Sequence, residues 1–145
     1  MDEVRRVVHA LQSDTPALPD AVTAMTGAYR EDGGEARFDL LGSPRSLPPA
    51  VGLALIRAAG EAMANARKHA AGRPVTVVLR FDDDRVALTV ADESGDLTAH
   101  QLPAPDGVGG GYGLASMHER LRLVGGSLTA GPTGAGWRVH AEVPA

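Results

Sequence analysis

The sequence Ala58-Ala-Gly-Glu61-Ala-Met-Ala-Asn65-Ala-Arg-Lys68-His69-Ala70 is an alanine-rich helical stretch interrupted by a few polar residues. At about 100° per residue, Glu61, Asn65 and His69 fall on one stripe of this helix, and Lys68 flanks the stripe. Asparagine is a poor helix former because its side chain competes for backbone hydrogen bonds. A carboxylate, a carboxamide and a cation aligned in this way can meet an acceptor or water, a metal ion and a phosphate. The stripe therefore indicates a nucleotide site, and an exposed polar face on a surface helix is the competing interpretation.

A glycine-rich run, Gly107-Val-Gly109-Gly-Gly111-Tyr-Gly113, leads directly into a predicted helix over residues 114–124. Glycine lets the backbone approach a phosphate closely, and a helix N-terminus directs free N–H groups and its positive dipole end at an anion. The run therefore predicts a phosphate cradle, and a glycine-rich loop that contacts nothing is the alternative. Residues 96–108, with two prolines and little apolar content, are expected to form a lid over the nucleotide.

A third motif lies between these two, where Thr89-Val-Ala-Asp92-Glu-Ser-Gly95 ends an apolar strand in an acidic turn. Together the three motifs resemble the ATP-binding domain shared by gyrase, heat-shock chaperones, histidine kinases and MutL repair proteins, often called the Bergerat fold. The stretch from Glu61 to Ala70 is similar to the N box of two-component sensor kinases of the nitrate-sensor class. The stretch from Gly111 to Leu121, followed by Gly125-Gly126, is similar to their second glycine box. The resemblance covers about residues 36–144 and implies a two-layer α/β sandwich, with a mixed sheet packed against helices.

The resemblance implies a role for each motif. Asp92 would accept a hydrogen bond from the adenine amino group, where a structural turn aspartate is the alternative. Asn65 would hold Mg²⁺ through its amide oxygen, and Lys68 would bring a positive charge to the phosphates. Glu61 is the candidate general base, for which a solvated glutamate in an ion pair is the alternative, and His69 would orient a neighbouring carboxylate or phosphate. The remaining nucleotide-binding residues are expected to be Gly95, Gly109, Gly111, Gly113 and Leu114.

Three positions depart from the pattern of the resembled family, two of them in the first glycine box. The first glycine box, Asp-x-Gly-x-Gly in the family, reads Asp92-Glu-Ser94-Gly95-Asp96, with Ser94 and Asp96 at the two glycine positions. We therefore expect a different backbone path around the adenine and a weaker affinity, because Asp96 adds negative charge near an anionic ligand. Trp137 stands where many members have a small hydroxyl residue, which predicts a reshaped adenine pocket.

The composition is that of a small soluble domain. The chain has 145 residues without cysteine, and its two Phe, two Tyr and one Trp require a core built from aliphatic side chains. Neither a secretory signal nor an apolar run long enough to span a bilayer is visible. A cytoplasmic chain without direct membrane contact is expected, even in a membrane-anchored parent protein. The formal net charge of −4 and the lack of a basic block argue against nucleic acid as a partner.

The turn chemistry supports the predicted α/β order. Pro44, Pro48 and Pro49 mark the turn into the long helix, with Ser46 as one candidate cap. The three aspartates at 82–84 are expected to form a solvated hairpin tip, because they lack the spacing of a calcium loop. Strands are predicted over residues 35–42, 75–81, 85–91, 127–130 and 137–143.

Residues 1–34 are expected to form an N-terminal helical segment and linker, and residues 35–145 the ATP-binding domain. An apolar stripe at helical spacing marks residues 2–12, and a second short helix is predicted over residues 18–29. The first segment resembles the tail of the dimerising hairpin of sensor kinases. The phosphoacceptor motif of that hairpin is missing, since His9 lacks an acidic neighbour on its C-terminal side. The chain is therefore expected to be an excised catalytic domain.

We expect this domain to use ATP and Mg²⁺ and to transfer the γ-phosphoryl group to a histidine on a separate dimerisation domain. That dimerisation domain would be its direct partner, and a response regulator would be an indirect one. Two alternatives remain open, an anti-sigma factor with serine-kinase activity on the same fold and a degenerate nucleotide-binding scaffold. The run from Met117 to Gly126 favours the sensor kinase.

Overall fold

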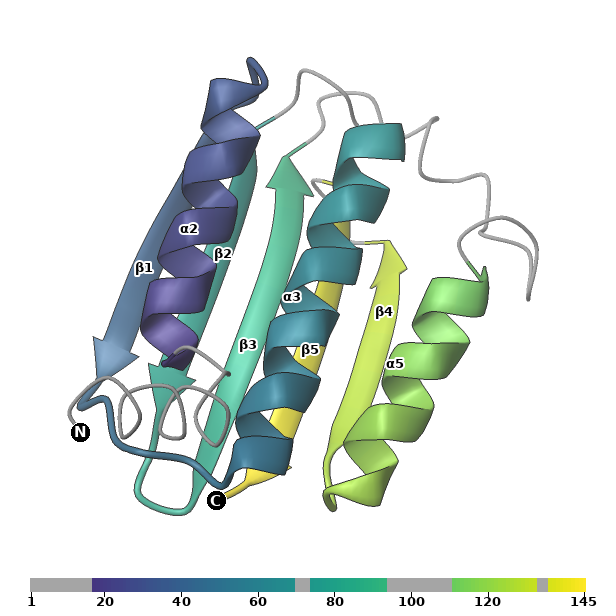
Figure 1. The fold of residues 1–145 in the computed structure, drawn as a ribbon. Coiled ribbons are helices and arrows are strands. Elements are labelled where there is room, and N and C mark those ends of the chain that lie inside the picture. The colour runs from purple at the N-terminus through teal and green to yellow at the C-terminus, as the bar shows by residue number, and fades with distance from the viewer. Residues whose placement is uncertain (1–16, 70–73, 94–110, 133–135) are drawn as a thin grey trace, which may run out of the picture.

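The computed structural model describes residues 17–69, 74–93, 111–132 and 136–145. A five-stranded sheet in the order β1-β2-β3-β5-β4 forms one layer, and the described helices cover one of its faces (Figure 1). This arrangement confirms the expected two-layer α/β sandwich. The helices are α2 (Leu18–Glu31), α3 (Pro49–His69) and α5 (Gly111–Leu123), and the strands are β1 (Ala36–Gly42), β2 (Val75–Phe81), β3 (Arg85–Glu93), β4 (Ser127–Pro132) and β5 (Gly136–Pro144).

The sheet is mixed, as expected. Strands β1 and β2 are parallel, whereas β2–β3, β3–β5 and β4–β5 pair in antiparallel fashion. In β2 the burial alternates along the strand, so that Val75, Val77 and Leu79 are buried while Arg80 is exposed. All five predicted strands are present, and each end lies within two residues of its predicted position.

Helix α3 lies across the middle of the sheet, between α2 and α5 (Figure 1). Its buried face combines larger aliphatic side chains with a row of alanines, which let the helix pack closely on the strands. The core therefore needs few aromatic side chains. The buried residues of α3 are Val51, Ala54, Leu55, Ala58, Ala59, Ala62, Met63 and Ala66.

The start of α3 differs from the prediction. The helix begins at Pro49, and the N–H groups of Val51 and Gly52 both donate to the carbonyl oxygen of Pro48 at 3.0 Å. Ser46 therefore lies outside the helix and does not cap it. Proline suits this position because its φ is already helical and its missing N–H would have no intrahelical partner in the first turn.

Helix α5 begins at Gly111, earlier than the predicted start at Leu114. The first N–H groups of a helix have no intrahelical partner, so glycines are tolerated in this turn. At the other end, Gly125 has a φ of +81°, and the N–H of Gly126 donates to the carbonyl of Leu121 at 2.7 Å. A Cβ on Gly126 would lie 2.6 Å from the carbonyl oxygen of Glu142. The glycine pair therefore ends α5 and lets the chain enter β4.

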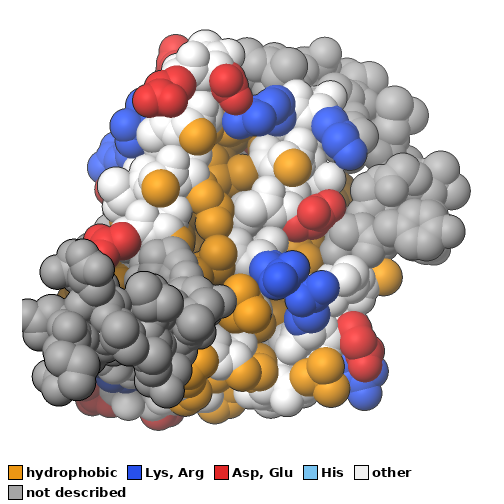
Figure 2. Space-filling view, in the orientation of Figure 1, with side chains coloured by type: hydrophobic (Ala, Val, Ile, Leu, Met, Phe, Trp, Pro, Cys, Tyr) orange, Lys and Arg blue, Asp and Glu red, His pale blue; other side chains and the backbone are white. Residues whose placement is uncertain are grey.

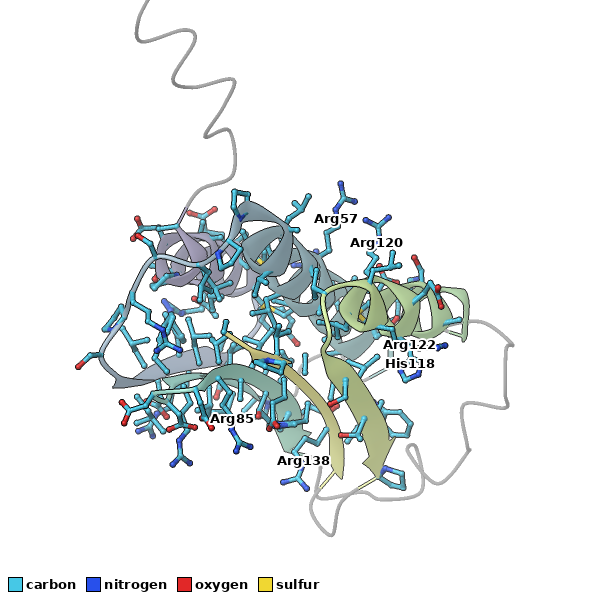
Figure 3. The ribbon with its side chains drawn as sticks, turned by 90° about the horizontal axis from the view of Figure 1, so that it is seen from below. Arg57, Arg85, His118, Arg120, Arg122 and Arg138 are labelled. Atoms are coloured by element: carbon cyan, nitrogen blue, oxygen red, sulfur yellow. The ribbon has the colours of Figure 1, made fainter. Side chains whose placement is uncertain are left out.

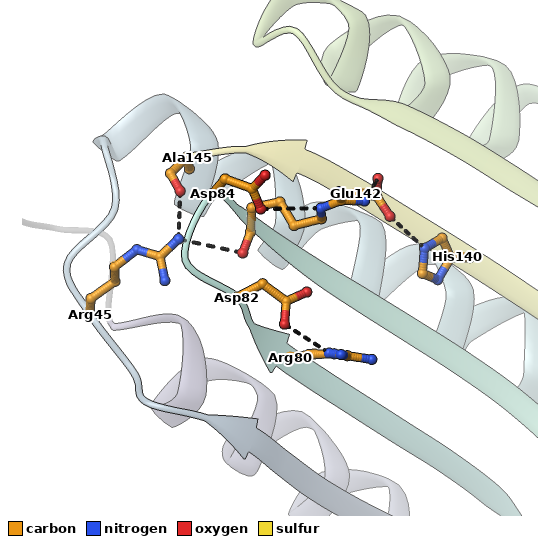
Figure 4. Close-up of polar contacts among 8 residues, drawn as sticks. Arg45, Arg80, Asp82, Asp84, His140, Glu142 and Ala145 are labelled. Carbon is orange, nitrogen blue, oxygen red and sulfur yellow. Dashed lines mark hydrogen bonds and ion pairs between the residues drawn. The ribbon is translucent and has the colours of Figure 1, made fainter.

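Polar contacts close the end of the sandwich that contains the β2–β3 hairpin. Arg45, from the β1–α3 connection, donates to the carbonyl oxygens of Arg85 and Ala145 (Figure 4). The N–H of Ala145 donates to the carbonyl of Asp84 at 3.1 Å. These contacts join three segments at this end, namely the hairpin, the connection into α3 and Ala145, which follows β5.

Charged side chains lie on both outer faces of the sandwich. Figure 3 shows Arg57 and Arg120 pointing away from the helical layer, and Arg85 and Arg138 on the opposite side of the sheet. On the helical face, acidic and basic side chains surround apolar ones that remain visible between the helices (Figure 2). None of the described helices has both the length and the apolar character needed to cross a membrane.

We predict that Leu55→Ala lowers the free energy of unfolding by about 2–5 kcal/mol, because the side chain is fully buried and its loss leaves a cavity. Leu123→Ala removes the same atoms from a side chain that is 78% exposed, and it should change the stability by less than about 0.5 kcal/mol. Urea unfolding of both variants measures the difference. Equal losses would contradict the assignment of α3 as the centre of the core.

Candidate functional site

The predicted site residues lie toward one end of the sandwich, where α3 and β3 end and from which α5 starts (Figure 1). The β2–β3 hairpin and Arg45 occupy the opposite end. Residues from three separate stretches of the sequence are therefore brought to the same end of the molecule. The sheet separates the candidate site from the hairpin by the length of β3.

The polar stripe of α3 provides the first side of the site. Asn65 is half-buried, and its side-chain Oδ1 is buried without a hydrogen-bond partner among the residues that the structure describes. A buried carbonyl oxygen without a partner costs free energy, so a ligand that supplies a hydrogen bond or a cation is expected here. Lys68 is exposed one turn later. His69 is the last residue of α3, and its side chain lies outside the described part of the structure.

Glu61 lies one turn before Asn65 on the same stripe and is half-exposed. Its carboxylate forms no ion pair with any residue in the described ranges. The alternative of a glutamate engaged in a surface ion pair therefore has no partner there. A carboxylate in this position keeps its capacity to accept a proton or a hydrogen bond from a molecule bound at Asn65.

Asp92 provides the second side of the site. It lies near the end of β3 with only 5% of its surface exposed, a degree of burial that is rare for aspartate. In the sheet register it stands between Val75 of β2 and Trp137 of β5. The structure thus places Trp137, the only tryptophan of the chain, beside Asp92 in the sheet, and its role in an adenine pocket stays a prediction.

The start of α5 provides the third side. Gly111, Gly113 and Leu114 belong to the first turn of this helix, so their N–H groups lie at its positive end. Nothing is described of the Leu114 side chain. Gly95, Gly109 and the predicted lid over residues 96–108 lie outside the described residues, and their roles stay predictions.

A cluster behind α3 was missed by the sequence reasoning. Arg67 forms an ion pair of 3.0 Å with Asp32, and its guanidinium lies 5.5 Å from the centroid of the buried Tyr29 ring. Burial raises the pKa of the Tyr29 hydroxyl above its usual value, Arg67 opposes this rise, and the charge of Asp92 adds to it. The electrostatic effect of Asp92 on Tyr29 indicates that the cluster lies close to the candidate site. No local motif connects Tyr29 with Arg67 in the sequence.

A metal ion at this site would have few protein ligands. Within the described ranges, no group of three or more His, Cys, Asp or Glu side chains could hold one. Magnesium usually keeps several waters and binds through one or two protein oxygens together with substrate phosphates. The Asn65 Oδ1 atom, buried and without a described partner, fits such a ligand.

Comparison with protein families and curated sequences gives a consistent result. Residues 50–145 match the family described as histidine kinase-, DNA gyrase B- and HSP90-like ATPase. The chain is 31% identical to the sensor histidine kinase MctS of Rhizobium johnstonii, over 98% of this chain and 31% of that protein. It is 28% identical to the nitrate/nitrite sensor protein NarX of Escherichia coli, over 80% of this chain and 19% of that protein. The chain thus spans about a third or less of the length of the curated relatives it matches.

Solved structures with the same fold include histidine kinases and their catalytic domains. The nucleotide-free catalytic domain of the histidine kinase ThkA superposes with a TM-score of 0.69 at 14% identity, covering 89% of this chain and 94% of that one. The mycobacterial sensor histidine kinase MprB gives a TM-score of 0.64 at 20% identity, covering 89% and 95%. At these identities the similarity establishes the fold.

Proposed function

We infer the function of this chain from its family, because it belongs to the histidine kinase-, DNA gyrase B- and HSP90-like ATPases, in the form found in sensor histidine kinases. We propose that it binds Mg-ATP between α3, β3 and α5. It would then present the γ-phosphoryl group to a histidine of a separate domain. The observation that carries the proposal is the buried Oδ1 of Asn65, which has no hydrogen-bond partner among the described residues. It lies in the helix that carries Glu61 and Lys68. Asn65 would supply an oxygen for the metal and Lys68 a positive charge for the phosphates, which are groups that a metal-bound triphosphate needs.

The adenine would bind at Asp92. A carboxylate accepts a hydrogen bond from an exocyclic amino group, and burial strengthens that bond because water does not compete. The flat indole of Trp137, next to Asp92 in the register, offers an apolar neighbour for the base. This contact would compensate in part for the irregular first glycine box.

The phosphates would lie between Asn65 and the first turn of α5. When bound, Mg²⁺ would offset the negative charge of the phosphate oxygens. Asn65 would hold the metal, Lys68 would contribute a mobile positive charge, and the N–H groups from Gly111 onward would face the anion. Positioning and electrostatic stabilisation supply most of the catalysis in phosphoryl transfer, and these few groups would supply this domain's share of both.

The acceptor would come from a dimerisation domain, with a response regulator as the next protein in the pathway. Glu61 would act as the general base that prepares the acceptor, since it lies one turn from Asn65 and forms no ion pair with a described residue. The cytoplasmic location expected from the sequence is part of this proposal, because it is where ATP and a response regulator would be met.

We predict that Asp92→Asn lowers the affinity for ADP by about 10- to 150-fold, because a hydrogen bond to a charged acceptor is lost and an amide N–H₂ faces a donor. Isothermal titration calorimetry measures the affinity, and thermal unfolding checks that the fold survives. Asp84→Asn, at the opposite end of the sheet, is the matched control and should bind as the wild type does. An unchanged ADP affinity in Asp92→Asn would rule out Asp92 as the adenine contact.

We predict that Asn65→Ala removes the increase in ATP affinity that Mg²⁺ produces, while metal-free ADP binding changes much less. The reason is that the amide oxygen would bind the metal and not the base. Asn65→Asp keeps an oxygen at the same place and should retain part of the Mg²⁺ effect. Equal losses with and without Mg²⁺ would mean that Asn65 has only a structural role.

We predict that the chain alone acquires no acid-labile phosphate from radiolabelled Mg-ATP, because the acceptor must be positioned by another domain. Adding the acceptor hairpin of the parent kinase should restore labelling. Glu61→Ala should then slow the transfer by a larger factor than it weakens ATP binding, since a base acts in the transition state. Labelling of His9 or His69 in the isolated chain would overturn the proposal, and acid-stable phosphoserine on an added protein would point to a serine kinase.

A further inference from the structure

We propose that Tyr29, Asp32 and Arg67, named here the α2–α3 clamp, are positioning residues that hold the nucleotide-binding end of α3 at a fixed place relative to Asp92. The inference rests on the proposed function, because the site that it positions is the ATP site. None of the three residues belongs to a glycine box, and Arg67 is the only one inside the N box. Through the clamp, α2 would help to position the ligand-binding residues of α3.

The clamp joins two helices through two different interactions. Arg67 reaches from the last turns of α3 to Asp32, the residue that follows α2, at 3.0 Å. The same guanidinium lies over the ring of Tyr29 at 5.5 Å, and Tyr29 is only 3% exposed. An exposed ion pair alone contributes little, but a planar guanidinium placed on a buried ring has a defined position. The end of α3 is thereby fixed against α2.

Arg67 and Asn65 use opposite sides of the same helical turn. Two residues along a helix turn through about 200°, so the clamp contacts α3 from behind the face that carries Asn65. Any rotation or displacement of this turn would move Asn65 and Lys68 together with Arg67. The clamp can therefore act on the ligand-binding atoms without touching a ligand.

Tyr29 is also connected to the strand that carries Asp92. The N–H of Gly34 donates to the carbonyl of Tyr29 at 3.1 Å, and a Cβ on Gly34 would overlap the Tyr29 ring. The next residue, Glu35, accepts a hydrogen bond of 2.9 Å from the N–H of Val75. Val75 is the register partner of Asp92. The ring of Tyr29 thus contacts the turn that leads to the base-binding end of the sheet.

The electrostatics agree with this geometry. The pKa of the Tyr29 hydroxyl is raised mainly by burial, and Arg67 lowers it while the charge of Asp92 raises it further. Tyr29 therefore lies within electrostatic range of Arg67 on α3 and of Asp92 on β3. The clamp thus joins α2 to the end of α3 that carries Asn65, within electrostatic range of Asp92 on β3.

The test compares Arg67→Ala with Arg80→Ala. Arg80 forms a similar exposed ion pair of 3.0 Å with Asp82 at the opposite end of β2, and its side chain is 61% exposed against 53% for Arg67. Calorimetry gives the Mg-ATP affinity of each variant. In the nucleotide-free protein, NMR follows the side-chain amide of Asn65 and the indole N–H of Trp137, which report the two sides of the site without any ligand.

We expect Arg67→Ala to lower the Mg-ATP affinity by about 2- to 5-fold and to shift both NMR signals, whereas Arg80→Ala does neither. Arg67→Lys should recover part of the affinity, because a lysine can reach Asp32 and the ring. Tyr29→Leu should behave like Arg67→Ala, and Tyr29→Phe should stay close to the wild type because it keeps the ring. Thermal unfolding of every variant shows whether the fold is retained.

The clamp proposal is overturned if Arg67→Ala leaves the NMR signals of Asn65 and Trp137 unshifted. It is also overturned if these signals shift but the Arg67→Ala variant binds Mg-ATP as tightly as the wild type. Equal effects of Arg67→Ala and Arg80→Ala would also overturn it, since they would reflect a general loss of stability. A wild-type chain that binds no nucleotide would refute the proposed function instead. In that case the NMR comparison still decides whether the clamp sets the position of Asn65.

Discussion

The packing of α3 on the sheet is the constraint on which the rest of the structure depends. The helix covers the middle strands with a face of alanines and a few larger side chains, and α2 and α5 pack on either side of it. Small side chains bring the helix close to β3, so the polar residues at its end lie near the end of that strand. The distance between Asn65 and Asp92 is therefore set by core packing. The proposed nucleotide site therefore depends on the packing of the hydrophobic core for the placement of its polar groups.

The two ends of the sandwich differ in how well their polar groups are satisfied, and the proposed site lies at the less satisfied end. At the hairpin end, Arg45 and the N–H of Ala145 form hydrogen bonds with backbone carbonyl oxygens, and the chain connections are short. At the other end, Asn65 keeps a buried oxygen without a described partner, and Asp92 is buried near the end of its strand. Leaving the Asn65 oxygen in this state costs free energy. Well-satisfied contacts elsewhere can offset that cost, as is usual for binding sites.

Much of the fold and part of the candidate site could be predicted from the sequence, for physical reasons. Strand alternation and glycine turns are local signals, so all five strands were found, and the stripe from Glu61 to His69 follows from helix geometry alone. Helix starts were less predictable, because Pro48 closes the first turn of α3 through its carbonyl and Ser46 does not. The contact of Tyr29 with Arg67 could not be predicted, since it depends on how two helices pack. Pairs of this kind leave no trace in the local sequence.

The mixed sheet also has a consequence for the order in which the chain can fold. Strands β2 and β3 are separated only by residues 82–84, and β4 and β5 only by residues 133–135, so both ladders can form with little loss of chain entropy. Strand β1 pairs in parallel with β2 across residues 43–74, which include all of α3. Parallel pairing across such a distance is slow to form unless the crossing helix is already in place. Edge strand β1 is therefore the part of the sheet whose formation depends most on α3 having folded.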